Sequence, residues 1–129
     1  MIKIGTDICS ISRITEAHTR FGERFLRRIL TEHEIAYIQR DERHMLARLA
    51  GRFAAKEAAA KALGTGWYGL DWKEVEVTHH ESGEPQLQFH GRAAAIAESR
   101  GLSRCEVSIS HEREFATAFV VCYSDWRPQ

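Results

Sequence analysis

Alternating apolar and polar side chains open the chain, with Ile2, Ile4 and Ile8 in the segment Met1–Ile8. A period of two is typical of a half-buried β-strand, and Asp7 falls on the face opposite the isoleucines. The same alternation returns in Asp71–Thr78 and Gln86–His90, which are separated by the turn sequence S-G-E-P. These two segments therefore predict a hairpin.

Two more strands are predicted near the carboxyl end, over Cys105–Ser110 and Phe115–Tyr123. The second is almost continuously apolar, which is typical of a central strand. Between the two hairpins, the alanine-rich segment Gly91–Arg100 predicts a short helix that stops at Gly101.

After the first strand, the hydrophobic period changes to that of a helix. One helix is predicted from Ser12 to about Arg28, and a second runs through Gln39 after the capping-box sequence T-E-H-E. The third, Arg43–Leu63, is rich in Ala, Leu, Lys, Glu and Arg and contains no proline. The order of a strand, three helices, a hairpin, a helix and a second hairpin indicates an α+β domain.

Small residues occupy much of the long helix, at positions 50, 51, 54, 55, 58, 59, 60 and 62. So little side-chain bulk predicts that another element packs close to this helix. Gly64 stands where a left-handed residue commonly ends a helix.

The chain has 129 residues with 43% hydrophobic content, enough for one domain over 1–123 followed by a polar tail over 124–129. A domain of this size can bury a core but hardly a deep two-lobed cleft, so an enzymatic site can require a neighbouring subunit. The 18 basic and 18 acidic residues cancel, which argues against overall attraction to nucleic acid or a membrane.

Three cysteines, Cys9, Cys105 and Cys122, lie far apart without a C-x-x-C pair, and we expect them to be reduced thiols in the core. The chain begins directly with strand-like sequence, and no segment approaches the ~18 apolar residues of a membrane helix. A cytoplasmic protein is therefore expected.

Asp7 and Glu57 are the two acids without an obvious neutralising neighbour in the sequence. Mg²⁺ is held by one or two carboxylates while it keeps waters and takes oxygens from substrate phosphates. If the two acids converge, they form such an incomplete magnesium site. Alternatively, Asp7 caps a turn and Glu57 pairs with Lys61 one helical turn later.

The long helix also presents cations beside Glu57. One stripe of its surface carries Phe53, Glu57 and Lys61, and the neighbouring stripe carries Arg52 and Lys56. Phosphate binding is one interpretation, and simple stabilisation by the helix dipole is the other. The loop Gly64–Gly66 follows a helix instead of preceding one, so it either ends the helix or holds phosphate through side chains and outward-facing amides.

Two more basic features are candidates for binding. His111 ends a strand after Ser108 and Ser110, where it can meet a nucleotide phosphate or simply bond within a turn. A basic ridge gathers on the first predicted helix at spacings of seven, four and four, formed by Arg13, Arg20, Arg24 and Arg28. It suits an acidic protein partner, or a solvated face paired with Glu16 or Glu23.

Three separated motifs resemble those of the holo-(acyl-carrier-protein) synthases, small phosphopantetheinyl transferases. They are G-T-D-I at 5–8, G-R-F-A-A-K-E-A-A-A-K-A-L-G-T-G at 51–66 and V-S-I-S-H-E at 107–112. The sequence F-L-R-R-I-L-T-E-H-E at 25–34 and the G-E-P-Q-L turn also match. The resemblance covers nearly the whole chain, and only W-Y-G-L-D-W at 67–72 and the tail fall outside the pattern.

The resemblance implies a small phosphopantetheinyl transferase fold, with a mixed or antiparallel sheet and a long helix, assembled as a homotrimer with sites between subunits. It implies Mg²⁺-dependent transfer of phosphopantetheine from coenzyme A to a serine of apo-acyl carrier protein, for fatty acid biosynthesis. Asp7 and Glu57 would bind the metal, and Lys61 would join them in catalysis. Coenzyme A would meet Arg52, Lys61, Gly64, Thr65, Gly66, Ser110 and His111, and the carrier would meet Arg13, Arg20, Arg24 and Arg28.

Two other functions remain open from the residues alone. A non-catalytic module can bind coenzyme A or another nucleotide anion through the same cations, but it has no use for two converging acids. An oligomeric scaffold can use the small-residue helix for packing alone.

Overall fold

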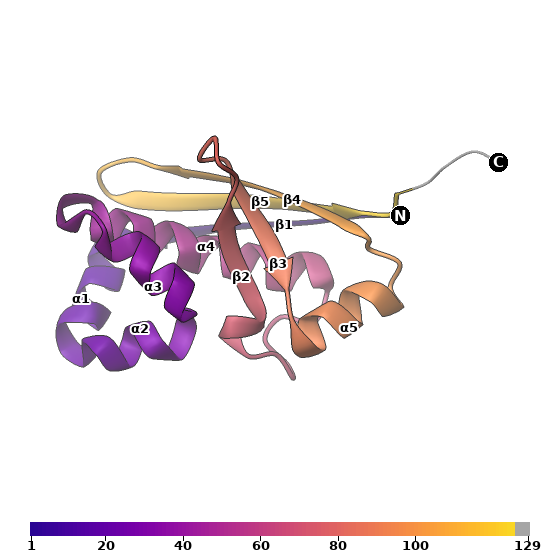
Figure 1. Cartoon of the computed structure of the whole chain (residues 1–129), viewed down its shortest axis with the longest axis horizontal. Coiled ribbons are helices and arrows are strands. Elements are labelled where there is room, and N and C mark those ends of the chain that lie inside the picture. The colour runs from indigo at the N-terminus through magenta and orange to yellow at the C-terminus, as the bar shows by residue number, and fades with distance from the viewer. Residues whose placement is uncertain (126–129) are drawn as a thin grey trace.

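The structure, a computed structural model, describes residues 1–125. The helices and strands follow one another in an α+β arrangement (Figure 1). In chain order they are β1 (Ile2–Ser10), α1 (Ile11–Phe21), α2 (Glu23–Ile29), α3 (Glu32–Gln39), α4 (Met45–Leu63), β2 (Val75–His79), β3 (Pro85–Phe89), α5 (Gly91–Ser99), β4 (Arg104–His111) and β5 (Phe115–Tyr123). Short 3-10 turns at Glu42–His44 and Trp72–Glu74 precede α4 and β2.

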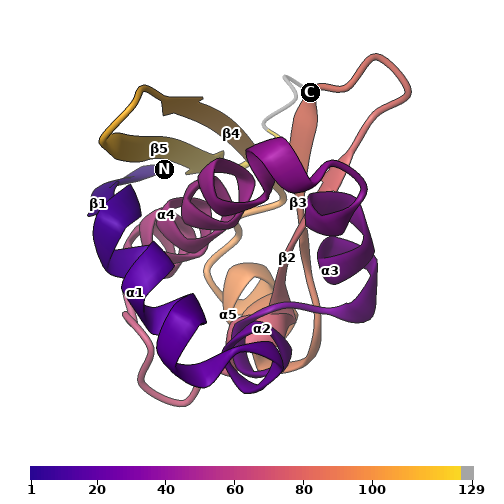
Figure 2. The same cartoon turned by 90° about the vertical axis from the view of Figure 1, so that its left-hand side faces the viewer.

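Two antiparallel sheets form around α4. One has the order β1-β5-β4, which confirms the prediction that the apolar strand β5 is central, and the other is the β2-β3 hairpin. Figures 1 and 2 show α4 against the three-stranded sheet, with α1, α2 and α3 gathered towards one end of the molecule and α5 towards the other. Alanines of α4 belong to both apolar clusters of the core, so this helix joins the two halves of the protein.

The orientation of β1 differs from the expectation. Its isoleucines Ile2, Ile4 and Ile8 lie on the outer face and are 71%, 62% and 62% exposed. The residues that face α4 are Gly5, which is buried, and the partly buried Asp7 and Cys9. A glycine rather than an isoleucine sets this contact, because a Cβ at Gly5 would lie 1.8 Å from the carbonyl oxygen of Ala58.

Two predicted elements are shorter in the structure. The helix expected over residues 12–28 is divided at Gly22, whose φ of 57° interrupts the helical backbone between α1 and α2. The strand expected from Asp71 begins at Val75, because the Asp71 carboxylate caps the 3-10 turn by accepting from the Lys73 backbone N–H. Both deviations arise where a local backbone preference overrides the longer hydrophobic pattern.

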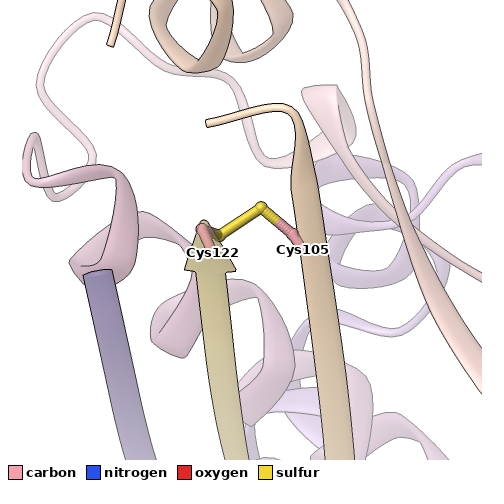
Figure 3. Close-up of a disulfide and its surroundings, with 2 residues drawn as sticks. All are labelled: Cys105 and Cys122. Atoms are coloured by element: carbon pink, nitrogen blue, oxygen red, sulfur yellow. A yellow bond between two sulfur atoms is a disulfide. The ribbon is translucent and has the colours of Figure 1, made fainter. Parts of the chain in front are cut away.

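The expectation of three reduced cysteines is wrong for two of them. Cys105 and Cys122 form a disulfide between β4 and β5 (Figure 3). The antiparallel register places them directly opposite one another, with their Cα atoms 4.0 Å apart, although 17 positions separate them in sequence. Cys9 remains a free thiol.

Two further features concern membrane spans and the carboxyl-terminal tail. No helix among residues 1–125 is long and apolar enough to cross a membrane. Of the predicted polar tail, Ser124 and Asp125 are exposed, and the Asp125 N–H donates to the Ser103 hydroxyl over 2.8 Å. Residues 126–129 of that tail lie outside the described part of the chain.

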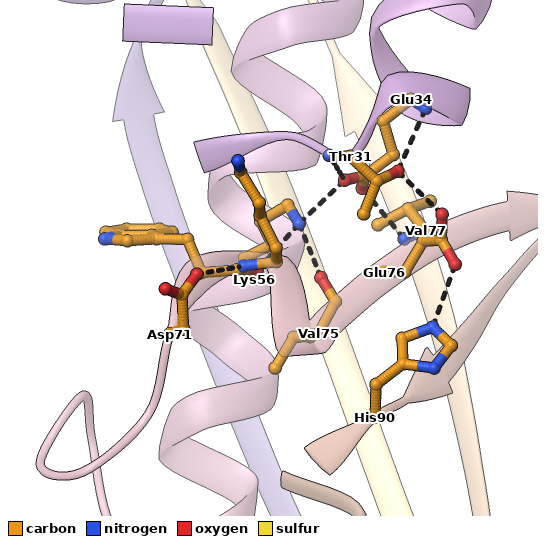
Figure 4. Close-up of polar contacts among 10 residues, drawn as sticks. Thr31, Glu34, Lys56, Asp71, Val75, Glu76, Val77 and His90 are labelled. Carbon is orange, nitrogen blue, oxygen red and sulfur yellow. Dashed lines mark hydrogen bonds and ion pairs between the residues drawn. The ribbon is translucent and has the colours of Figure 1, made fainter. Parts of the chain in front are cut away.

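A buried ion pair determines which face of α4 turns towards α3 and β2. Lys56 and Glu34 are fully buried, and the Lys56 ammonium donates to Glu34 over 2.9 Å and to the carbonyl oxygens of Trp72 and Val75 (Figure 4). The other Glu34 oxygen accepts from the Val77 N–H at 2.9 Å. Burial lowers the pKa of Lys56, and the charge of Glu34 opposes that shift. Lys56 therefore has a structural role, whereas the neighbouring stripe of α4, which carries Glu57 and Lys61, is available to bind a ligand.

Replacing Gly5 by Ala should destabilise the protein by about 3 kcal/mol, because the new methyl group meets a helix carbonyl that cannot move away. Urea denaturation measures the change, with the exposed Lys3→Ala variant on the same strand as control. A stability of Gly5→Ala equal to that of Lys3→Ala would contradict the close contact between β1 and α4.

Candidate functional site

An open cavity of about 470 Å³ lies where β1 meets α1, α2 and α4. Acidic, basic and aromatic side chains share its wall, including Asp7, Ser10, Arg13, Phe25, Phe53 and Glu57. Both acids predicted from the sequence therefore line one cavity, although 50 positions separate them. Their convergence follows from the contact between Gly5 and Ala58, because each acid lies within two residues of that contact.

Glu57 is a partly buried carboxylate that has no cationic partner within ion-pair distance in residues 1–125. Burial raises its pKa, and the negative charge of Asp7 raises it further, whereas the Trp67 indole and Lys61 act in the opposite direction. The expected alternative of a Glu57–Lys61 pair is not formed. Lys61 instead lies 3.4 Å from an Asp7 oxygen and donates to the Thr6 carbonyl oxygen over 3.0 Å.

The cavity also contains Cys9, a residue that the sequence did not single out for chemistry. Its thiol donates to the carbonyl oxygen of Ala50 over 3.2 Å. Burial and the negative charge of Asp7 raise the pKa of Cys9 to about 11. The thiol is therefore protonated near neutral pH and serves as a packing group between β1 and α4.

The donor set in the cavity fits a hard cation that retains open coordination positions. No group of three or more His, Cys, Asp or Glu side chains suited to a metal occurs among the described residues. Two carboxylates alone are too few to enclose an ion, but they match the sparse protein ligation of Mg²⁺. Asp7 and Glu57 are the residues here that can hold one, and Lys61 beside them can contact an anionic ligand.

Other predicted binding residues lie away from this cavity within one chain. Arg52 is buried on the α3 side of α4, where it donates to the His79 ring nitrogen over 2.9 Å and lies over the ring of Tyr37. Burial lowers the pKa of Arg52. The Arg52 Nε atom has no hydrogen-bond partner among residues 1–125, so part of its donor capacity is unused.

Ser110 and His111 are exposed at the end of β4, and β5 separates them from β1. His111 is opposite Ala116, which on its other side is opposite Cys9. The loop that follows α4 adopts the predicted terminating conformation, with Gly64 at a φ of 84°. Lys61 lies in the last turn of α4, where its carbonyl oxygen accepts from the Gly64 N–H and its ammonium lies beside Asp7.

The predicted arginine ridge is divided between two helices, with Arg13 and Arg20 on α1 and Arg24 and Arg28 on α2. All four are exposed, and none forms an ion pair within the described part of the chain. The pair that does form on α2 joins Arg27 to Glu23. A groove of about 450 Å³ next to the acid cavity is lined by basic and aromatic residues, namely Phe21, Arg24, Phe25, Arg28, Phe53 and Trp72.

This region also contains an aromatic stack that the sequence did not predict. Trp67 stacks on Trp72 with ring centroids 3.9 Å apart, and Trp72 stacks on Phe53 at 5.1 Å. The signal in the sequence was the pair of tryptophans in W-Y-G-L-D-W, directly after the glycine loop. Only the fold brings this pair next to Phe53 and thus to the cavity wall.

Comparison with known proteins shows strong similarity over most of the chain. Residues 3–120 match the model of the 4'-phosphopantetheinyl transferase superfamily. The holo-[acyl-carrier-protein] synthase of Gloeobacter violaceus is 47% identical over 92% of this chain and 89% of its own length. That of Halorhodospira halophila is 49% identical over 92% of this chain and 94% of its own.

Solved structures agree with these relatives. The holo-[acyl-carrier-protein] synthase of Neisseria meningitidis superposes with a TM-score of 0.88 at 38% identity. The match covers 96% of this chain and 100% of that one. The Helicobacter pylori enzyme, solved in complex with coenzyme A, has a TM-score of 0.82 at 32% identity and covers 93% of this chain and 99% of that one.

Replacing Glu57 by Gln should stabilise the metal-free protein at pH 7. The raised pKa of Glu57 means that the folded state binds this proton more tightly than the unfolded chain, so the ionised carboxylate costs stability above that pKa. Solvent screening of the partly exposed group limits the gain to about 0.5 kcal/mol. Urea denaturation in EDTA measures it, with the exposed Glu16→Gln as control.

The pH dependence provides the check on this cause. The advantage of Glu57→Gln should shrink towards acid pH, as Glu57 of the parent protein becomes protonated and neutral. A Glu57→Gln protein that is less stable than the parent at pH 7 would contradict an unneutralised carboxylate at this position.

Proposed function

Because the chain belongs to the 4'-phosphopantetheinyl transferase superfamily, we propose that it acts as a holo-[acyl-carrier-protein] synthase. It transfers the 4'-phosphopantetheine group of coenzyme A to a serine of apo-acyl carrier protein, in support of fatty acid biosynthesis. The observation that carries this proposal is the pair of carboxylates, Asp7 and Glu57, in one cavity beside Lys61. The named relatives supply the substrate class.

Asp7 and Glu57 would hold Mg²⁺, since Glu57 has no cation of its own among the described residues and the cavity is open to a ligand. The ion would supply positive charge to the diphosphate of coenzyme A when bound. Lys61 is 54% exposed at its side chain and can donate to a phosphate oxygen without leaving its position beside Asp7. Through the ion, the acids would orient the diphosphate, and the lysine would stabilise charge on it.

The reaction forms one bond and breaks one at the β-phosphorus of coenzyme A. The serine oxygen of the carrier bonds to this phosphorus and gives up its proton to water, the bond to the bridging oxygen breaks, and adenosine 3',5'-bisphosphate departs. Negative charge grows on the phosphoryl oxygens, where Lys61 can donate. No nucleophile of this chain is needed, so positioning and electrostatic stabilisation account for the rate enhancement.

Coenzyme A would extend from the acids to further groups, some of them contributed by a neighbouring copy of the chain. The proposed contacts are Arg52, Lys61, the loop Gly64–Gly66, Ser110 and His111. Unused donor capacity on Arg52 supports phosphate binding. Because Ser110 and His111 are separated from the acids by β5, a site that uses both sets is most simply completed between subunits.

An uncovered apolar face of the three-stranded sheet supports assembly into a homotrimer. Ile2, Ile4 and Ile8 of β1 lie outward beside Phe115 and Phe119 of β5, which are 40% and 45% exposed. A contiguous apolar surface of this kind commonly marks a contact between proteins. We place the subunit interface on this face, so that the end of β4 in one copy reaches the acid cavity of the next.

The exposed arginines beside the cavity would receive the acidic carrier. Arg13 lines the acid cavity, and Arg24 and Arg28 line the adjoining groove. Since none of these arginines is neutralised within residues 1–125, the surface retains its positive charge for a partner. We propose that the reaction takes place in the cytoplasm.

The test of function is incubation with apo-carrier, coenzyme A and Mg²⁺, followed by mass spectrometry of the carrier. The carrier should gain one phosphopantetheine arm, and EDTA should abolish the gain. Asp7→Asn and Glu57→Gln should each lower the rate on the order of 10²-fold or more, whereas the exposed Glu16→Gln on α1 should not. Coenzyme A binding without transfer would instead favour a non-catalytic coenzyme A module.

The assembly is tested by sedimentation equilibrium. The parent protein should have three times the 14.7 kDa mass of one chain. Phe119→Lys should shift it towards monomer, because a buried lysine at the interface lacks a partner, whereas Glu81→Lys in the β2–β3 turn should not. A parent protein that sediments as a monomer at assay concentration would contradict the trimer.

The carrier surface is tested by charge reversal on α2. Arg28→Glu should raise the KM for the carrier on the order of tenfold and change the KM for coenzyme A little. Arg27→Glu is the matched control, because Arg27 lies on the same helix and is paired with Glu23. Equal losses for the two variants, or for the two substrates, would argue against the proposed surface.

A further inference from the structure

The segment W-Y-G-L-D-W at 67–72 is connected to the acid cavity through its tryptophans. Trp67 stacks on Trp72 at 3.9 Å and Trp72 on Phe53 at 5.1 Å, and Phe53 lines the cavity together with Glu57. Backbone bonds anchor the start of the segment, because the Gly66 N–H donates to the Ala60 carbonyl oxygen over 3.2 Å. The stack therefore fixes the position of the Trp67 ring next to the wall of the cavity.

Two polar groups near this point lack a partner among residues 1–125. The Trp67 Nε1–H is buried and donates to no acceptor among residues 1–125. The Glu57 carboxylate likewise accepts no hydrogen bond in that part of the chain; burial raises its pKa, and the nearby Trp67 indole acts in the opposite direction. A buried donor left unpaired is destabilising, so a small rotation of Glu57 that closes this bond is favourable.

We propose that Trp67 is a positioning residue for Glu57: its indole N–H donates to the Glu57 carboxylate and holds it in the orientation that binds Mg²⁺. This rests on the proposed role of Glu57 as a metal ligand. Ligating carboxylates are commonly oriented by a hydrogen bond from a second residue, and loss of that residue typically weakens metal binding 10- to 100-fold. The rigid stack gives Trp67 the fixed position that such a role requires.

A purely structural role for the stack makes a different prediction. Trp72 lies at the centre of the stack, between Trp67 and Phe53, so packing alone should make Trp72 at least as important as Trp67. The orienting role depends instead on one N–H at Trp67. Trp67→Phe removes that donor, and Trp72→Phe is the matched control that removes a stacked indole of the same kind.

The experiment is a titration of the full-length protein with Mn²⁺, with no substrate present, followed by electron paramagnetic resonance. Trp67→Phe should raise the Kd for Mn²⁺ about tenfold, and Trp72→Phe should change it less than twofold. Equal weakening by the two variants, or none by Trp67→Phe, would overturn the proposal. Glu57→Gln separates the test of the metal site from the test of Trp67. If this variant leaves the Mn²⁺ affinity unchanged, the proposed metal site is wrong, and the role of Trp67 is wrong with it.

A second measurement covers the case in which Trp67→Phe does not fold. Replacing Trp67 by 3-benzothienylalanine keeps the size and stacking of the ring and removes only the N–H donor. The same tenfold loss of Mn²⁺ affinity is expected. In a Trp72→Phe, Trp126→Phe background Trp67 is the single indole, and its fluorescence should respond to Mg²⁺; a response that persists in Glu57→Gln would refute the contact.

Discussion

The close contact between β1 and α4 is the constraint on which the candidate site depends. At Gly5 the strand backbone approaches the carbonyl oxygen of Ala58 so closely that no side chain fits between them. Asp7 follows this contact on the strand, and Glu57 precedes it on the helix. Two carboxylates repel each other when ionised, and the charge of Asp7 acts to raise the pKa of Glu57. Backbone packing brings them together and overrides this repulsion.

Charged residues on α4 have opposite roles, decided by their partners. Lys56 is fully buried, and Glu34 with two carbonyl oxygens satisfies its three donors. Such a pair contributes little net stability, but it is costly to break and so specifies how the helix is turned. Glu57, one residue later, faces the cavity with no counter-ion among the described residues. The satisfied charge orients the helix, and the unsatisfied charge is free to bind a ligand.

The same reasoning applies to the loop after α4, where the Trp67 indole N–H and the Glu57 carboxylate both lack a partner among the described residues. An unpaired indole N–H beside an unneutralised carboxylate is unfavourable in the metal-free protein, because neither group gains a partner for the solvation that burial removes. A hydrogen bond between them would satisfy the indole and leave the carboxylate oriented towards a cation. Stability and function therefore compete at this site, as is common where polar groups await a ligand.

Much of the local structure and the identity of the acids could be predicted from the sequence. The capping box at Thr31 and the end of α4 at Gly64 depend on contacts within a few residues, so their signals are complete in the local sequence. The candidate ligands Asp7 and Glu57 were also evident, because neither has a neutralising neighbour that the chain offers locally. The stripe that Glu57 shares with Phe53 and Lys61 on α4 followed from helical periodicity alone.

Only the tertiary structure decided which groups meet. The alternation in β1 predicted a buried isoleucine face, yet the glycine face turned inward, because α4 accepts a backbone and not a branched side chain. The bond between Cys105 and Cys122 required the register of β4 on β5. The sequence by itself determined the elements and the candidate chemistry; faces, registers and partners were decided by contacts between residues far apart in the chain, whose energies no local pattern contains.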